Sequence, residues 1–290
     1  MLEYIKVFIN AFLGTLDWTL KSITFQVPFY ENYFWGLVLL SVFVWILEIK
    51  FPWRKKQGIF RKDFGLDVFY MFFNFFLFTI AISGIYEVFT LLLSSTGMTS
   101  NSLQIIPLEA LSLPIQLLLF FVLLDFMQWC THILLHKYSF LWAFHKIHHS
   151  VKEMGFAAHL RYHWMENILY KPLKTIGLML LGGFEPQHAY VIHFIAIAIG
   201  HFNHANLNIT WGPFKYVFNN PVMHLHHHAH TQPQGKVGVN FGISLSLWDF
   251  LFKTSFVPKT NPHLPLGFPG DKEIPTTFWG QFRYGFKRNS

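Results

Sequence analysis

Long apolar runs separated by short polar stretches set the pattern of this chain. The first run covers residues 34–49, and the second covers residues 65–93 before a polar stretch begins at Ser94. A third run starts at Leu113 and continues to His136. A helix of about 20 apolar residues crosses the hydrocarbon core of a bilayer. Each run, with its flanking residues, therefore predicts a membrane-spanning helix.

The amino-terminal segment, residues 1–24, has a different pattern. Charged residues interrupt its apolar positions at Glu3, Lys6, Asp17 and Lys21. The segment also lacks a basic start followed by a cleavage site of small residues, which a signal peptide would have. We expect an amphipathic helix that lies in the membrane interface.

A last apolar region, residues 175–199, is interrupted by Gly182, Gly183 and Pro186. Glycine and proline break helices, so this region predicts a hairpin with two legs rather than one straight span. The segment that follows is rich in His, Asn, Pro and Gly. The chain has no repeat of fixed period and no evident separate soluble domain.

The composition supports a membrane protein, because 52% of the residues are hydrophobic and only 13% are charged. The net charge of +7 would suggest a nucleic-acid partner if the basic residues formed a patch interleaved with exposed aromatics. Six of them instead follow the first apolar run directly: Lys50, Arg54, Lys55, Lys56, Arg61 and Lys62. Such a cluster is typical of the cytosolic end of a span and of contact with anionic lipid. We therefore expect a membrane and no nucleic acid as partner.

The remaining charges predict the sidedness of the other spans. No Lys or Arg occurs between Lys62 and Lys137, so the loop near Thr99 lacks the charge that keeps a segment in the cytosol. We expect this loop on the far side of the membrane. The third span then returns to the cytosol beside Lys137 and Lys146.

The histidines are the most informative feature of the sequence. Of the 17, sixteen lie between His132 and His230. His132 and His136 are four residues apart, and two later clusters have the spacing i, i+3, i+4. These clusters are His145, His148, His149 and His224, His227, His228. Residues so spaced project from one face of a helix, so each cluster can present two or three imidazoles to a common point.

The number of histidines decides which metal site to expect. Imidazole binds zinc, copper, iron and nickel through a neutral nitrogen. A structural zinc ion takes four ligands, usually with cysteine, and a zinc protease helix needs Glu directly after its first histidine; neither pattern occurs here. Eight or more imidazoles are too many for one tetrahedral ion. They suit two ions of higher coordination with positions left open for O₂, and two redox-active irons fit best.

Further histidines extend the candidate ligand set. We expect His204 to bind metal, and His201, one helical turn earlier, could join it. His163 lies three residues before Glu166 and either binds metal or orients a ligand. His159 is expected to form an ordinary interior hydrogen bond. The others are expected to face solvent, support ligands or be structural: His188, His193, His226, His230 and His263.

Three carboxylates are candidates to support the cofactor site, because a ligating histidine usually donates its other N–H to a carboxylate or carbonyl. They are Asp125, which lies seven residues before His132, Glu166 and Asp249. An acid so close to the bilayer is a functional candidate. Two alternatives stay open: Asp125 could pair within the helix bundle, and Asp249 could cap a helix.

These motifs resemble the fatty acid hydroxylase / sterol desaturase superfamily of membrane di-iron enzymes. The match comprises HxxxH at residues 132–136 and HxxHH at residues 145–149 and 224–228. Residues typical of the family flank these boxes: Asp125, Arg161, His163, Glu166, His204-Ala-Asn-Leu, Asn220-Pro221, Leu247-Trp248-Asp249, Phe252 and Thr254. The resemblance covers residues 113–256. Ile133 and Trp164 depart from the family's usual residues and weaken assignment to a subfamily.

The resemblance implies an all-α fold: a multi-pass integral membrane helical bundle with a cytosolic histidine-rich helical cap that binds metal. Residues 1–112 would hold the interfacial helix and the first membrane helices, and residues 113–256 the catalytic domain. Residues 257–290 would be a proline-rich tail.

The implied enzyme holds two iron ions that activate O₂. Electrons would come from an external donor such as a cytochrome or a ferredoxin with its reductase. The product would be a hydroxylated or desaturated lipid, the lipid being a sterol, fatty acyl chain, carotenoid or ether lipid. Nine histidines are the expected catalytic ligands: His132, His136, His145, His148, His149, His204, His224, His227 and His228.

A membrane metal-ion transporter or metal-binding protein is the main alternative. Transporters place polar residues or broken helices at mid-membrane, whereas these histidines gather at the ends of predicted spans. A membrane haem protein would need only two or four axial histidines. The oxygenase is therefore the preferred interpretation, and the sequence does not decide between hydroxylation and desaturation.

Overall fold

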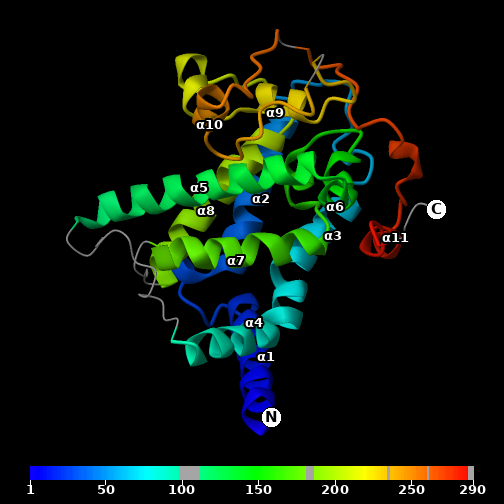
Figure 1. Cartoon of the computed structure of the whole chain (residues 1–290). Coiled ribbons are helices and arrows are strands. Elements are labelled where there is room, and N and C mark those ends of the chain that lie inside the picture. Colours follow the sequence, from blue (N-terminus) through cyan, green and yellow to red (C-terminus); the bar gives the residue numbers. More distant parts are fainter. Residues whose placement is uncertain (98–110, 181–185, 234–235, 260, 287–290) are drawn as a thin grey trace. The chain divides into compact units, whose positions relative to one another are not determined.

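The computed structural model describes residues 1–97, 111–180, 186–233, 236–259 and 261–286, with the backbone alone at 174–180 and 186–189. Every regular element in these ranges is a helix (Figure 1). Extended pairing within them is limited to two isolated bridges, Phe218 with Leu245 and Ala229 with Leu266. The prediction of an all-α fold is confirmed.

The chain divides into two compact units that interleave along the sequence. Unit 1 comprises residues 1–40, 72–124 and 172–194, and unit 2 comprises residues 41–71, 125–171 and 195–290. Four long helices contribute to both units: α2 (Tyr33–Lys50), α5 (Leu113–Lys137), α7 (Trp164–Leu180) and α8 (Pro186–His204). The division of the sequence at residues 112 and 256 stays a prediction.

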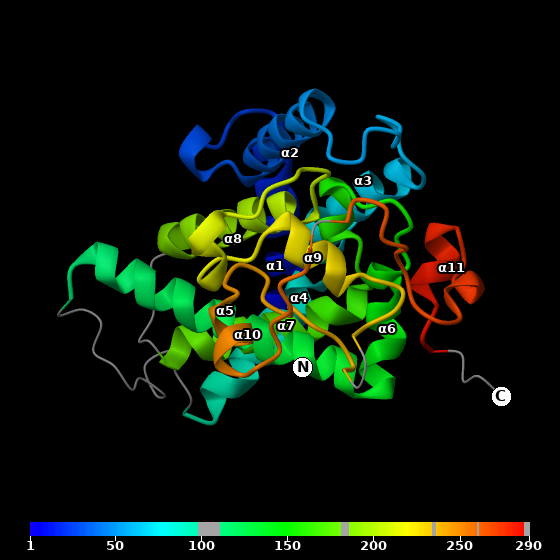
Figure 2. The same ribbon diagram turned by 90° about the horizontal axis from the view of Figure 1, so that it is seen from above.

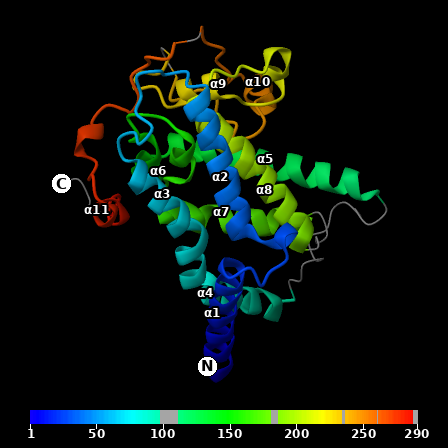
Figure 3. The same cartoon turned by 180° about the vertical axis from the view of Figure 1, so that it is seen from behind.

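Unit 1 is built on α1 (Leu2–Ile23), which packs along α4 (Phe78–Ser95) (Figures 1 and 3). It also contains the beginnings of α2 (Tyr33–Lys50) and α5 (Leu113–Lys137). The end of α7 (Trp164–Leu180) and the beginning of α8 (Pro186–His204) complete it. Aromatic side chains pack together in this unit, where Tyr33 contacts the rings of Phe75, Tyr190 and Phe194.

Unit 2 gathers the other ends of the long helices around short ones. It holds α3 (Phe64–Phe72), α6 (Ser139–His149), α9 (Pro221–His227), α10 (Leu247–Leu251) and α11 (Phe278–Phe282) (Figure 2). Three 3₁₀ turns join them: η4 (Phe156–Leu160), η5 (Gly212–Tyr216) and η6 (Asp271–Glu273). The connections between these helices are long and are fixed by hydrogen bonds from buried side chains.

Three helices of the described part are long and apolar enough to cross a membrane. They are Tyr33–Lys50, the continuous helix Phe64–Ser95 and Leu113–Lys137. A π-helical turn, η2 (Phe73–Leu77), joins α3 to α4 within the second. Their bounds match the three predicted spans within a few residues. Side chains such as Phe43, 53% exposed, and Leu118, 59% exposed, suit contact with lipid.

The predicted hairpin at residues 175–199 corresponds to two helices, since α7 ends at Leu180 and α8 begins at Pro186. Gly182 and Gly183, the predicted breakers, lie outside the described residues. The first helix begins earlier than expected, at Trp164, and continues through Pro172. The side of the membrane on which each loop lies stays a prediction.

A buried network of charges joins the segment before α3 to the segment before α7. Arg61 donates to Asp67 at 2.5 Å, and Arg161 donates to Asp63 at 3.1 Å and to Asp67 at 3.2 Å. The sequence places Arg61 among the residues that contact lipid headgroups, but its side chain is 3% exposed. Two carboxylates within reach of the two guanidinium groups compensate the cost of burying them.

We predict that the close approach of α1 and α4 depends on Gly84. A Cβ at this position would lie 2.5 Å from Phe8 Cδ2 and 2.7 Å from the Phe8 carbonyl oxygen. Gly84→Ala should therefore destabilise the protein by about 1–3 kcal/mol, as overpacking does. The thermal midpoint in mild detergent, followed by size-exclusion chromatography, measures this loss.

The matched control is Gly14→Ala in α1, where a Cβ meets no atom within 4 Å. Alanine favours helix over glycine by up to about 1 kcal/mol, so this variant should be as stable as the parent or more so. Equal midpoints for the two variants would contradict the predicted packing.

Candidate metal centre

The helices of unit 2 bring nine histidines together from four places in the chain. His132 and His136 come from the end of α5, and His204 is the last residue of α8. His145, His148 and His149 lie at the end of α6. His224 and His227 lie on α9, and His228 is the C-cap residue that follows it. Pro221 begins α9 and the Asn220 side chain accepts a hydrogen bond from the Met223 N–H, so local sequence fixes where this helix starts.

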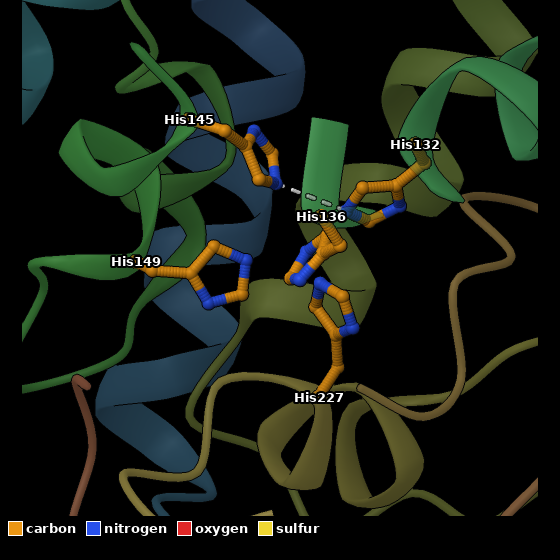
Figure 4. Close-up of side chains that lie close together, drawn as sticks. All are labelled: His132, His136, His145, His149 and His227. Carbon is orange, nitrogen blue, oxygen red and sulfur yellow. Dashed lines mark hydrogen bonds between the residues drawn. The ribbon is translucent and has the colours of Figure 1, made fainter. Parts of the chain in front are cut away.

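The nine histidines form two groups. Group 1 is His132, His136, His145, His149 and His227, and its five side chains point toward one another (Figure 4). Group 2 is His148, His204, His224 and His228. In each group, one ring nitrogen of every member lies within 4.8 Å of the others. The groups adjoin, because the rings of His149 and His228 stack at a centroid distance of 4.3 Å.

The two HxxHH boxes are divided between the groups in the same way. In α6, His145 and His149 belong to group 1, and His148 belongs to group 2. In α9 and its cap, the first and third histidines belong to group 2 and the middle one, His227, to group 1. Positions i and i+4 lie about 40° apart around a helix, whereas i+3 lies about 60° to the other side of i. Each box therefore serves two points rather than the single common point that its spacing suggested.

Backbone carbonyls orient four of the rings through Nδ1. His132 Nδ1 lies 2.7 Å from the Phe241 oxygen, and His227 Nδ1 lies 2.8 Å from the Val239 oxygen. His148 Nδ1 lies 3.1 Å from the Arg161 oxygen, and His204 Nδ1 lies 2.8 Å from the Gly200 oxygen. A carbonyl only accepts, so each Nδ1 must carry the proton and donate it. In a neutral ring, Nε2 is then left with its lone pair directed into the group.

This arrangement fits a bound cation. His148 Nε2 and His204 Nε2 lie 3.3 Å apart, and with both Nδ1 atoms protonated no proton lies between them. Burial lowers the pKa of His148 to about 3, so the ring does not gain a second proton at neutral pH. The buried Nε2 atoms of His136, His149 and His227 have no hydrogen-bond partner among the described residues. Lone pairs that converge without a donor are stabilised by a metal ion, so both groups are suited to bind metal.

The buried carboxylate of Glu166 also indicates that a cation binds at group 1. Its Oε2 lies 3.1 Å from His145 Nδ1, and its side chain is buried. Burial raises the pKa of Glu166 to about 8, which makes an isolated carboxylate costly here. A cation on the far nitrogen of His145 would favour the ionised carboxylate, which then accepts the His145 N–H.

Asp125 and Asp249 act on the backbone rather than on the rings. Asp249 accepts hydrogen bonds from the N–H groups of Phe241 and Gly242. Asp125 accepts from the N–H groups of Ser244 and Leu245. Tryptophan indoles hold the two carboxylates, Trp129 on Asp249 and Trp248 on Asp125. Both acids therefore fix the loop 239–246, whose carbonyls orient His132 and His227.

The structure does not bring His163 or His201 into either group. His163 Nε2 donates to the Phe282 carbonyl at 2.9 Å, and its Nδ1 accepts from the Met165 N–H. His201 lies 3.1 Å from the Ser41 hydroxyl and 2.9 Å from His159 Nδ1. His159 thus has an interior hydrogen bond, as expected, although its ring also packs against His204.

The other histidines lie apart from both groups. His193 packs against the rings of Tyr33 and Phe75 in unit 1, and His226 packs against Phe256. His263 is exposed, and the His188 side chain lies outside the described residues. Sequence reasoning missed the four carbonyls that orient the rings, because every residue type has a carbonyl and the side-chain pattern carries no signal for it.

A family model described as fatty acid hydroxylase matches residues 117–254. The match contains both histidine groups together with Asp125, Glu166 and Asp249. Residues 117–254 are a fatty acid hydroxylase domain. The family prediction is confirmed, and the domain includes the residues of the candidate metal centre.

The names of curated relatives of this domain describe enzymes that act on lipids. An ornithine lipid hydroxylase (OlsE) of Rhizobium tropici is 30% identical over 60% of this chain and 51% of its own length. The alkylglycerol monooxygenase of Homo sapiens is 26% identical over 46% of this chain and 29% of its own. That of Xenopus tropicalis is 25% identical over 48% and 30%. The match therefore covers about half or less of the length of each of these relatives. No solved structure matches this chain.

We predict that Asp249 is required for metal retention although it touches no histidine. In Asp249→Asn, one carboxylate oxygen becomes an NH₂ group, which would face the Gly242 N–H now 2.8 Å from Asp249 Oδ2. The loop 239–246 should shift, and metal affinity should fall about 10–100-fold, as for other residues that support metal ligands. Metal content after dialysis against a weak chelator measures the change.

The control for this variant is Asp17→Asn on α1, which removes an exposed carboxylate paired with Lys21. It should retain metal like the parent. Unchanged metal retention in Asp249→Asn would show that the loop does not depend on this carboxylate.

Proposed function

We propose that this protein is a membrane-bound di-iron oxygenase that hydroxylates a lipid. The observation that carries the proposal is the pair of adjoining histidine groups, whose buried nitrogens converge without protons between them. Nine imidazoles in two groups are too many for one structural zinc ion, which takes four ligands, and they suit two ions of higher coordination with positions left for O₂. The fatty acid hydroxylase domain supports iron as the metal.

The overall reaction balances as R–H + O₂ + 2 e⁻ + 2 H⁺ → R–OH + H₂O. Two bound iron ions would supply the activation of O₂ and the cleavage of the C–H bond. The electrons must come from an external donor, for which we propose a cytochrome or a ferredoxin with its reductase.

The chain's own residues hold the centre rigid and dry. Group 1 would bind one ion through five imidazoles, and group 2 would bind the other through four. The four carbonyls and Glu166 fix the ring orientations, which keeps each Nε2 available as a ligand. His227 is fully buried and His228 is 1% exposed, so bulk water has little access to the site from this side.

The substrate is proposed to be a lipid that lies in the bilayer. The relatives' names indicate hydroxylation of an ornithine lipid and mono-oxygenation of alkylglycerol, which favours insertion of oxygen over desaturation. Membrane-spanning helices beside the centre would give an acyl or alkyl chain access without leaving the bilayer. The comparisons give no support to the transporter alternative.

The active site is proposed to lie on the cytosolic side of a multi-pass protein. The basic residues between Lys50 and Lys62 and the Lys137 that ends α5 support this sidedness. The same side would give access to soluble or membrane-anchored electron donors.

The proposed function predicts that lipids gain one oxygen atom from O₂ when the protein is active. Membranes that contain the protein, supplied with a reducing system and ¹⁸O₂, should yield a lipid that carries one heavy oxygen atom. His148→Ala removes a group 2 nitrogen and should lower the labelled product to background. Mass spectrometry of extracted lipids measures the label.

Exposed His263 provides the control, and His263→Ala should keep full labelling. A lipid that loses two hydrogen atoms and carries no heavy oxygen would indicate desaturation instead. Absence of any changed lipid in the parent membranes, at full iron content, would contradict the oxygenase proposal.

A further inference from the structure

The strongest feature that the metal centre does not use is an apolar surface formed by η5 and α10 in unit 2. We call it the η5–α10 surface and define it by Trp211, Phe214, Tyr216, Val217, Leu251 and Phe252. Phe214 is 65% exposed, Leu251 60% and Phe252 54%. A soluble surface rarely leaves so many large apolar side chains together, and such a patch marks an interaction site.

The two elements of this surface form one structure. The rings of Tyr216 and Phe250 pack at a centroid distance of 4.9 Å. Ser246 donates its hydroxyl hydrogen to the Lys215 carbonyl at 2.6 Å, and Phe218 pairs with Leu245 in an isolated bridge. Figures 1 and 2 show the segment of η5, in yellow, beside α10, in orange. The exposed side chains therefore belong to one rigid patch.

The patch adjoins a candidate membrane span. Phe252 packs on Phe126 and Trp129 of α5, with ring centroids 6.2 and 4.7 Å apart. Phe126 lies about 16 Å along the helix axis from Lys137, the charged residue that ends α5. With Lys137 at the level of the headgroups, Phe126 and the ring packed on it lie at the level of the acyl chains.

The charge around the patch is also that of a membrane-contacting surface. Between residues 205 and 259 the only acidic residue is Asp249, which is fully buried. Lys215 lies over the Tyr216 ring at 5.3 Å, and Lys253 is exposed beside Phe252. Aromatic residues with flanking lysines are typical of the zone where headgroups meet acyl chains.

We infer that the η5–α10 surface inserts into the membrane interface beside α5 and contacts anionic lipid headgroups through Lys215 and Lys253. The occupant is the bilayer itself rather than a second protein. This inference concerns where unit 2 meets the membrane and does not rest on the proposed reaction. It also sets the loop 239–246 next to lipid, because Leu245 and Phe218 join that loop to the patch.

A fluorophore placed on the surface tests this inference in the full-length protein. In a Cys130→Ala background, Phe214→Cys and Leu251→Cys each provide one thiol for an environment-sensitive nitrobenzoxadiazole label. The labelled proteins are reconstituted in vesicles of phosphatidylcholine with phosphatidylglycerol. Both sites should emit at shorter wavelength than in water, lose most of their fluorescence to lipids that carry a doxyl group near the headgroup, and resist aqueous iodide.

Glu273→Cys is the control, because Glu273 is exposed and charged on η6. Its label should be quenched by iodide and not by doxyl lipid. Iodide quenching at 214 and 251 equal to that at 273 would overturn the inference. Protection from iodide that appears only at high protein-to-lipid ratio, without doxyl quenching, would assign the surface to a second copy and would also overturn it.

Discussion

The structure depends on gathering nine imidazoles, eight of them buried and His136 half-buried, so that their nitrogens face one another. Each buried nitrogen without a donor or a cation costs about 1–3 kcal/mol, so the arrangement is unfavourable for a chain that binds nothing. The four backbone carbonyls make the cost unavoidable, because they hold the protons of His132, His148, His204 and His227 at Nδ1. Binding of the proposed metal ions would remove this cost and would couple the folding of unit 2 to metal binding.

Other residues of unit 2 hold the histidine rings in this arrangement. Asp125 and Asp249 fix the loop 239–246, and the loop carbonyls fix two of the rings. The charge network of Asp63, Asp67 and Arg161 fixes the segment whose carbonyl orients His148. The carboxylates Asp63, Asp67, Asp125 and Asp249 thus act one step away from the histidine groups, whereas Glu166 contacts the ring of His145 directly.

Periodic features could be predicted from the sequence. The apolar runs predicted the three candidate spans, and the spacing of the boxes predicted eight of the nine histidines that the structure gathers, the ninth being His204. Spacing on one helix did not reveal that each HxxHH box serves two points, because this depends on what packs against the helix from each side. His163 and His201 were further candidate ligands, but their partners include the Phe282 carbonyl and Ser41, which lie far from them in sequence.

Features built on the backbone could not be predicted. A hydrogen bond from a histidine ring to a backbone carbonyl depends on where two distant segments meet. So does the close packing of Phe8 on Gly84, which leaves no space for a Cβ. The membrane-facing role inferred for η5 and α10 is similar. Both segments are too short for a periodic signal, and their common surface exists only once Ser246 and Lys215 are brought together.

X-ray absorption at the iron edge, combined with the iron content of the full-length protein reconstituted with Fe(II), tests the central claim most directly. The account predicts about two iron ions per chain, each bound by nitrogen and oxygen ligands with imidazole scattering. Fewer than one ion per chain at saturating Fe(II), or a coordination shell without imidazole, would contradict it.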